Sequence, residues 1–214
     1  PTADEIKVRA IDNYAAQNRA VTKQDYLAIL YRMPSKFGAI KRANISQDSN
    51  SSKRNLNLYV VAENQNGNLA NASDSLKENV KQWLNHYKMI NDSIDILDAG
   101  IVNIGINFEL VGELEKDFTL VLNDAIDALK QKYTTKFNLG EPIYISDIYS
   151  TLNDVDGVVD TKNVQIVRKF GAGYSSVQYD IDSNTTADER LVRIPENLIF
   201  EIKDLDSDIV GEIR

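Results

Sequence analysis

A strict alternation of apolar and polar side chains between residues 102 and 110 constrains the fold of this chain more than any other feature. Successive side chains of a β-strand point to opposite faces of the sheet, so a period of two predicts a strand with one buried face and one solvated face. The buried face needs a covering layer of helices or strands. The apolar positions are Val102, Ile104, Ile106, Phe108 and Leu110, and the polar positions are Asn103, Gly105, Asn107 and Glu109.

Amphipathic helices are predicted on both sides of this strand along the chain. Ser75 to Glu78 form a capping-box pattern, and Asp117 is a suitable N-cap for the second helix. Apolar residues then recur at a spacing of three and four, the period of one helix face. We predict that Leu122, Ile126 and Leu129 pack against the apolar face of strand 102–110. The two stripes are Leu76, Val80, Trp83, Leu84 and Tyr87, and Phe118, Leu122, Ala125, Ile126, Leu129 and Tyr133.

A pattern of short helix, glycine turn and strand occurs twice. In the first copy, a capping box at residues 22–25 opens a helix with Leu27, Leu30 and Tyr31 on one face, which Pro34 ends. Residues 37–39 then turn the chain into a strand at 40–45. In the second copy, Ser146 caps a helix at 147–152, and a turn at Gly157 leads into a strand at 158–167. The repetition predicts a duplicated helix–sheet unit.

The remaining strands define the expected domain organisation. Residues 56–60 and 94–97 have strand patterns, and residues 47–54 are polar and fit an exposed hairpin or loop. After Phe170 the chain has the pattern of an all-β tail. Val177, Tyr179 and Ile181 alternate there, and apolar segments follow at 191–194 and 198–202, with loops between them. We predict an α+β fold with a first α+β unit at 1–100, a second at 101–170 and a C-terminal β tail at 171–214.

Composition excludes several classes of protein. The chain has no cysteine, which excludes disulfide scaffolds, thiolate zinc sites and cysteine nucleophiles. The formal net charge of −8 disfavours binding to nucleic acid or to an anionic membrane. No apolar run approaches the ~18–20 residues that span a bilayer. Charged residues among the first ten do not fit a signal peptide, and a start without methionine is consistent with a fragment of a longer protein.

Motifs for catalysis, cofactors or metals are all incomplete. His86 is the only histidine and falls outside the apolar stripe of its helix, which indicates a surface position. The spacing Asp180-x-Asp182-x-Asn184 resembles a calcium loop, but Thr185 and Leu191 occupy the places of its glycine and glutamate. Asp204, Asp206 and Asp208 fail in the same way, so both segments are interpreted as solvated acidic loops. We therefore predict no enzyme activity, no catalytic residue, no cofactor and no metal.

Charge is unevenly distributed along the chain. Residues 32–54 contain six bases and one acid, Asp48, whereas residues 180–214 contain ten acids and four bases. Two solvated faces explain this distribution without any partner. The alternative is a pair of complementary patches that orient one protein on another.

Residues 18–26 resemble a motif of the baseplate J-like family, the wedge proteins of contractile phage tails. They are Asn-Arg-Ala-Val-Thr-Lys-Gln-Asp-Tyr, where the family has Arg-Ala-Val-Thr, two further residues, Asp-Tyr, a helix and a Pro-Gly-Val-type turn. Residues 34–39 are a longer version of that turn. A second family pattern is a glycine, an extended stretch, a capped short helix and Gly-Val before a strand. Residues 140–165 match it, with Gly157 and Val158 in place. The resemblance covers about residues 19–167, while segment 47–54 and the tail look most like the larger, ring-forming wedge protein of T-even-type phages.

The resemblance implies a structural, non-enzymatic protein of the virion. Members of the family ring the baseplate hub, associate with themselves and with other wedge proteins, and link tail-fibre signals to sheath contraction. For this chain it implies a homodimer within a ring, contacts with other wedge proteins, and a place in the tail baseplate after assembly in the host cytoplasm. Two alternatives stay open. An enclosed pocket with convergent polar groups would favour a ligand-binding α+β domain. A carboxyl pair ~5–10 Å apart in a cleft would favour a tail-associated hydrolase.

Overall fold

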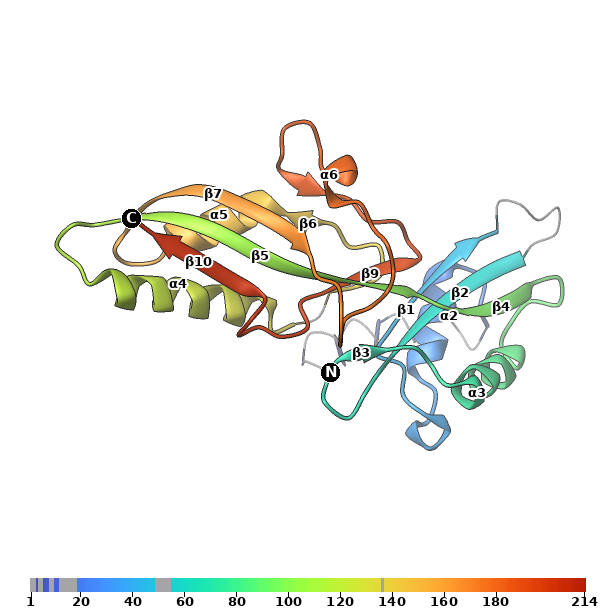
Figure 1. Cartoon of the computed structure of the whole chain (residues 1–214). Coiled ribbons are helices and arrows are strands. Elements are labelled where there is room, and N and C mark those ends of the chain that lie inside the picture. The colour runs from blue at the N-terminus through green and yellow to red at the C-terminus, as the bar shows by residue number, and fades with distance from the viewer. Residues whose placement is uncertain (1–2, 4–5, 8–9, 12–18, 49–54, 136) are drawn as a thin grey trace. The chain divides into compact units, whose positions relative to one another are not determined.

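The structure is a computed structural model, and it describes residues 3, 6–7, 10–11, 19–48, 55–135 and 137–214. Contacts divide the chain into two compact units, Pro1–Ala99 and Gly100–Arg214. Each unit combines helices with a β-sheet (Figure 1), which confirms the predicted α+β class. None of the helices in the described ranges is long and apolar enough to cross a membrane.

The first unit has a mixed sheet in which β2 is the central strand. β1 pairs with β2 in antiparallel register, and β4 pairs with β2 in parallel register on a crossover through α3. Parallel neighbours need a crossover, usually a helix, because the chain must return to the end of the sheet at which the first strand began. The elements are α2 (Lys23–Tyr31), η1 (Ser35–Phe37), β1 (Arg42–Gln47), β2 (Asn55–Glu63), β3 (Leu69–Ala70), α3 (Asp74–Asn85) and β4 (Ser93–Asp98).

The core of the first unit lies between this sheet and helices α2 and α3. Tyr26, Ile29 and Leu30 are the buried face of α2, one residue away from the face that the sequence predicts. The Trp83 indole N–H donates to the Ile29 carbonyl at 2.8 Å, which fixes α3 against α2. The strand predicted at 40–45 lies two residues later as β1, and of the predicted loop 47–54, residues 49–54 lie outside the described residues.

The second unit is built around β5, which is the predicted strand extended at both ends. β7 pairs with β5 antiparallel on one side, and β9 and β10 pair with it in parallel on the other, at opposite ends of the strand. The elements are β5 (Gly100–Gly112), α4 (Phe118–Tyr133), β6 (Ile143–Tyr144), α5 (Ile145–Asn153), β7 (Val158–Arg168), α6 (Ile181–Asn184), β8 (Leu191–Val192), β9 (Leu198–Glu201) and β10 (Ile209–Ile213).

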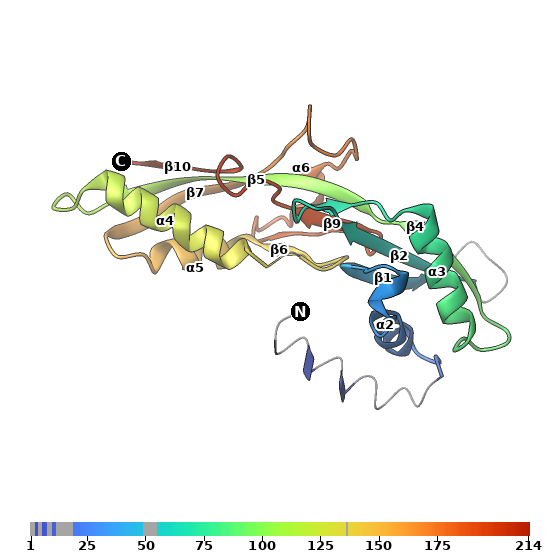
Figure 2. The same cartoon turned by 90° about the horizontal axis from the view of Figure 1, so that it is seen from below.

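Helices α4 and α5 lie on one face of the β10–β5–β7 sheet (Figure 2). The five predicted apolar positions of β5 are buried in one cluster with Leu129, and Leu122 and Ile126 pack against that cluster. The expected packing of helix 117–133 on strand 102–110 is therefore confirmed. Val121, which the sequence analysis leaves out of the helix stripe, is also buried.

The second face of β5 differs from the prediction in its first half. Asn103 is 3% exposed, and a Cβ on Gly105 would lie 2.7 Å from the Asp208 carbonyl oxygen and 2.4 Å from the Lys169 side chain. The main-chain N–H of Ser175 donates to Asn103 Oδ1 at 2.7 Å. The expected wet face is wrong here because the segment after β7 folds back over it and covers it.

The elements after residue 144 differ from the sequence prediction in three places. Residues 177–180 form no strand, and Ile181 begins the short helix α6, because the Asp180 carboxylate caps that helix. Residues 209–213 form β10, a strand that the sequence pattern does not predict. Helix α5 begins at Ile145 after Tyr144, so Ser146 is not its cap.

Contacts group residues 171–214 with residues 100–170 in one unit, whereas the sequence pattern predicts a separate β tail at 171–214. The reason is visible in the pairing, because β9 and β10 come from the tail and both pair with β5. Each unit has its own central strand, β2 or β5, which pairs with both antiparallel and parallel neighbours. Their chain order differs, since β1 precedes its central strand β2 while β7 follows β5.

Candidate interaction surface

The motif that carries the family resemblance forms the start of α2. Thr22 is the N-cap, its hydroxyl accepts from the Asp25 N–H at 3.2 Å, and the Asp25 carboxylate accepts from the N–H groups of Thr22 and Val21 at 2.9 and 3.0 Å. Partial burial opposes ionisation of Asp25, but these backbone hydrogen bonds outweigh it and lower its pKa. The predicted capping box is confirmed, and it ties the segment before α2 to the helix.

The same motif anchors α2 to the segment between α3 and β4. The Tyr26 hydroxyl donates to the buried carboxylate of Asp92 at 2.7 Å, and the N–H of Ala20, itself fully buried, donates to the Tyr87 carbonyl at 2.9 Å. Each of these motif residues has a structural task within the first unit. The motif therefore stabilises the fold, and its geometry does not resemble an active site.

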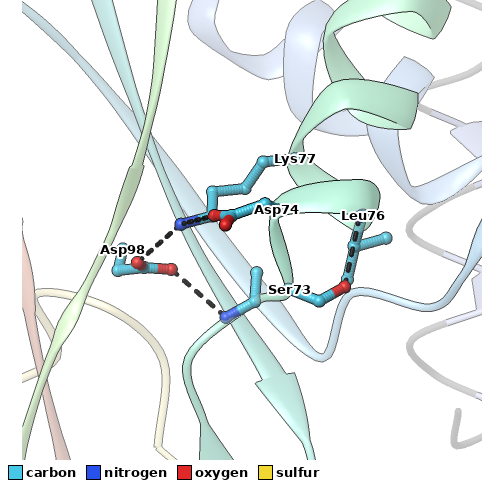
Figure 3. Close-up of polar contacts among 6 residues, drawn as sticks. Ser73, Asp74, Leu76, Lys77 and Asp98 are labelled. Atoms are coloured by element: carbon cyan, nitrogen blue, oxygen red, sulfur yellow. Dashed lines mark hydrogen bonds and ion pairs between the residues drawn. The ribbon is translucent and has the colours of Figure 1, made fainter.

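A second polar cluster joins α3 to β4 (Figure 3). Lys77 Nζ lies 2.8 Å from the Asp98 carboxylate and 3.3 Å from that of Asp74, and the Ala72 N–H donates to Asp98 at 3.2 Å. The hydrogen bond to Asp98 raises the pKa of Lys77. Ser73 is the N-cap of α3 and accepts from the Leu76 N–H at 3.2 Å. The predicted capping box at Ser75 is wrong, because α3 begins two residues earlier.

Replacing Ser73 with alanine should lower the free energy of unfolding of the first unit by about 0.5–2 kcal/mol, the usual effect of losing an N-cap. Ser75→Ala is the matched control and should change it by less than ~0.5 kcal/mol. Trp83 is the only tryptophan of the chain and lies in α3, so its fluorescence during urea unfolding reports on this unit. Equal effects of the two changes would contradict the assignment of the cap.

Two buried polar clusters hold the tail of the second unit on β5. In the first, the Asn103 side-chain amide donates to Glu201 at 2.9 Å while its oxygen accepts from Ser175. In the second, the Ile106 N–H of β5 donates to the Asp208 carbonyl at 2.8 Å, and the fully buried Asp208 carboxylate accepts from the Tyr174 hydroxyl at 2.7 Å and from the Asp204 N–H at 3.1 Å. Polar networks with paired members rigidify a core. The tail is therefore fixed to β5 by directional bonds as well as by apolar packing.

The two calcium-like segments have other tasks. Asp180 caps α6, and the hydrogen bond from the Ser183 hydroxyl lowers the pKa of its carboxyl group. Asp206 pairs with Lys130 at 2.6 Å, and Asp208 is fully buried. The interpretation of 204–208 as a solvated loop is thus wrong for Asp208. Within the described part of the chain, no three His, Cys, Asp or Glu side chains come together in a geometry that could hold a metal ion.

His86 is exposed, whereas several residues of the two charged segments are buried or form ion pairs. His86 is the exposed C-cap residue of α3. Lys41 forms an ion pair with Glu63 at 2.8 Å, and Arg42 is only 8% exposed, so neither is a free cation of a basic patch. Lys53 and Arg54 lie outside the described residues. In the tail, Glu201 and Asp208 are buried, and the exposed acids include Asp182, Asp188, Glu189, Glu196 and Glu212.

Comparison with solved structures gives a likeness at the level of the fold. No protein-family model matches the chain, and no curated protein matches it in sequence. A chain in the cryo-EM structure of the six-fold symmetrised anti-feeding prophage baseplate is similar, with a TM-score of 0.56 and 12% sequence identity. The match covers 95% of this chain and 42% of that chain, so this chain spans less than half the length of its structural neighbour. At this identity the likeness shows that the two share a fold.

Proposed function

We propose that this chain is a structural component of the baseplate of a contractile, phage-like tail. The observation that carries the proposal is the fold likeness to a baseplate chain over 95% of the residues. The motif at residues 18–26 supports it independently, because the resemblance that it carries comes from the sequence and names the same kind of particle. The described residues of that motif stabilise the fold, which fits a protein whose task is mechanical.

Within the baseplate, we infer a wedge subunit that contacts copies of itself around the hub and passes rearrangements on to the sheath. The buried polar clusters around Asn103 and Asp208 support this role, because a satisfied polar network keeps a module rigid while force passes through it. Contacts with other wedge proteins follow from the same family resemblance. No catalytic, cofactor or metal-binding residue forms part of the proposal.

Exposed apolar side chains supply candidate anchors for such contacts. Leu114 is 95% exposed in the turn between β5 and α4, and Val159 on β7 is 61% exposed. The register of β5 with β7 brings Val111, also exposed, close to Val159. Apolar anchors surrounded by polar residues are typical of the centre of an interface. We therefore place a subunit contact at this end of the β5–β7 pair.

Sedimentation velocity of the chain at rising concentration should show a reversible dimer. A specific interface of this kind buries on the order of 1,200–2,000 Å² in total. Leu114→Ser should speed dissociation, because the loss of an apolar anchor acts mainly on the off-rate. A monomer at every concentration would contradict the homodimer and leave contacts with different subunits.

Deletion of the gene tests the role in the baseplate. We expect contractile tails without completed baseplates, and restoration of the baseplates by the intact chain supplied from a plasmid. Normal baseplates in the deletion strain would contradict the proposed function.

A further inference from the structure

The longest edge strand of the second unit is β7, which pairs only with β5 among the described strands. The Lys169 N–H donates to the Asn103 carbonyl at 2.9 Å, and this bond fixes which residues of β7 face β5. Antiparallel hydrogen bonds recur at every second residue, so Val167 and Gln165 also face β5. On the other side of β5, the Ile106 N–H donates to the Asp208 carbonyl. Even-numbered residues of β5 therefore face β10, and odd-numbered residues face β7. The main-chain groups of 164, 166 and 168 therefore face away from the sheet.

The edge of β1 in the first unit shows how this chain closes an edge strand. The Asp48 N–H donates to the Asn55 carbonyl, so the main-chain groups of Ala43 and Ile45 face away from β2. The Ala43 N–H donates to the Tyr31 hydroxyl, and the Ile45 N–H donates to Asn44 Oδ1, both at 2.9 Å. Among the described residues, no side chain or main-chain group accepts a hydrogen bond from the N–H of Val164, Ile166 or Arg168 on β7. Protected edges resist pairing with other chains, and open edges accept it.

An open groove of about 1040 Å³ runs along this edge of β7. Residues 163–167 of β7 line one side, and Ile145, Ser146 and Tyr149 of α5 line another. The opposite wall is formed by Ile181, Asp182 and residues 185–190. Val164 and Ile166 are 7% and 8% exposed. Pockets for small molecules usually enclose ~300–1,000 Å³ and bury most of the ligand. An open groove of this size beside a strand edge fits an extended peptide better.

The opposite wall of the groove is acidic. Asp182, Asp188 and Glu189 are exposed there, and Arg190 is the one base of that wall among the described residues. The hydrogen bond from the Thr186 hydroxyl lowers the pKa of Asp188, so its carboxyl group is ionised at neutral pH. Such a wall attracts basic side chains, and the attraction weakens as salt screens it.

We propose that β7 receives one extended, basic polypeptide segment of another subunit as an added strand in this groove. That the donor is a baseplate subunit rests on the proposed function, whereas the binding of a basic segment to β7 does not. Main-chain bonds to residues 164, 166 and 168 supply affinity, and the acidic wall selects the charge of the segment. A second copy of the chain does not fit as the donor through its own β7, because that strand carries the same flanking wall.

The test uses the full chain and a synthetic octapeptide of alternating lysine and valine as the probe. We expect the amides of residues 164, 166 and 168 to exchange rapidly in the free chain, while those of 165 and 167 are protected. Saturating peptide should then protect all of them. Ala187→Trp fills the groove from its exposed wall and should weaken binding at least about tenfold. Ala172→Trp is the matched control, because Ala172 is exposed outside the groove, and it should bind like the unchanged chain.

Asp188→Lys provides a second variant that does not fill the groove, and it should weaken binding and reduce its salt dependence. Absence of binding, equal binding by the Ala187→Trp and Ala172→Trp variants, or protection of the edges of β4 or β10 instead of β7 would overturn the proposal. These outcomes are independent of the deletion phenotype. Loss of baseplates in the deletion strain with no peptide binding would reject the groove alone, and binding with normal baseplates would reject the proposed function alone.

Discussion

Replacing Phe108 with alanine is expected to lower the free energy of unfolding of the second unit by about 3–5 kcal/mol, the usual effect of removing a buried phenylalanine ring. Phe108 is 3% exposed in the middle of β5, and it fills the space beside Gly211 of β10. A Cβ on Gly211 would lie 2.3 Å from the tip of that ring, so the ring packs directly against the main chain of β10. The change therefore leaves a cavity between the sheet and α4.

Amide hydrogen exchange of β5 is the suitable measurement, because the fluorescence of Trp83 reports on the other unit. Phe170→Ala is the control, since Phe170 is 73% exposed and should change the free energy by less than ~0.5 kcal/mol. A loss below 1 kcal/mol for Phe108→Ala would show that β5 does not form the centre of this core.

The buried carboxylate of Asp208 is expected to matter far more than the exposed one two residues before it. Asp208→Ala removes the acceptor of the Tyr174 hydroxyl and of the Asp204 N–H, and hydrogen bonds to charged groups contribute about 1.5–3 kcal/mol. Asp206→Ala removes an ion pair between Asp206, which is largely exposed, and Lys130, and should cost about 0–1 kcal/mol. Exchange of the β5 and β10 amides measures both. Equal effects of the two changes would contradict the burial of Asp208.

The pH dependence of stability offers a second readout of the same cluster. The hydrogen bond to Asp208 raises the pKa of Tyr174 above its ordinary value near ~10. A raised pKa in the folded state means that this contribution is complete below about pH 10 and is lost as the pH rises through the folded pKa. The Asp208→Ala variant should lack this alkaline loss of stability.

Local patterns predicted the parts of the fold that depend on short-range contacts. The alternation in β5 and the stripe in α4 report side-chain periods, so the sheet–helix core followed from them. The box at Thr22 and the turn at Gly157, whose φ is 96°, also depend only on neighbouring residues. The N-cap of α3 was predicted wrongly because Ser73 and Ser75 both have a side chain that can cap a helix, and only the position of the helix start decides between them.

Long-range contacts explain what the sequence did not predict. The second face of β5 is buried by residues from 169 onward, and β10 becomes a strand by pairing in parallel with β5, about a hundred residues earlier in the chain. Asp208 stands in an acidic run, so its burial depends on Tyr174 and on the fold of the tail. The open edge of β7 could not be predicted from the sequence either. Whether an edge strand is closed depends on distant side chains, as at β1, where the Tyr31 hydroxyl accepts from the Ala43 N–H.

The location of the chain in an assembled particle tests the central claim most directly. A tag placed on the loop at 171–173, where Gly171 and Gly173 have open space around them, can be labelled with gold and imaged on purified contractile tails by electron microscopy. Our account predicts label at the baseplate end of the tail in particles whose contraction is intact. Label along the sheath, or purified particles that lack the chain, would contradict it.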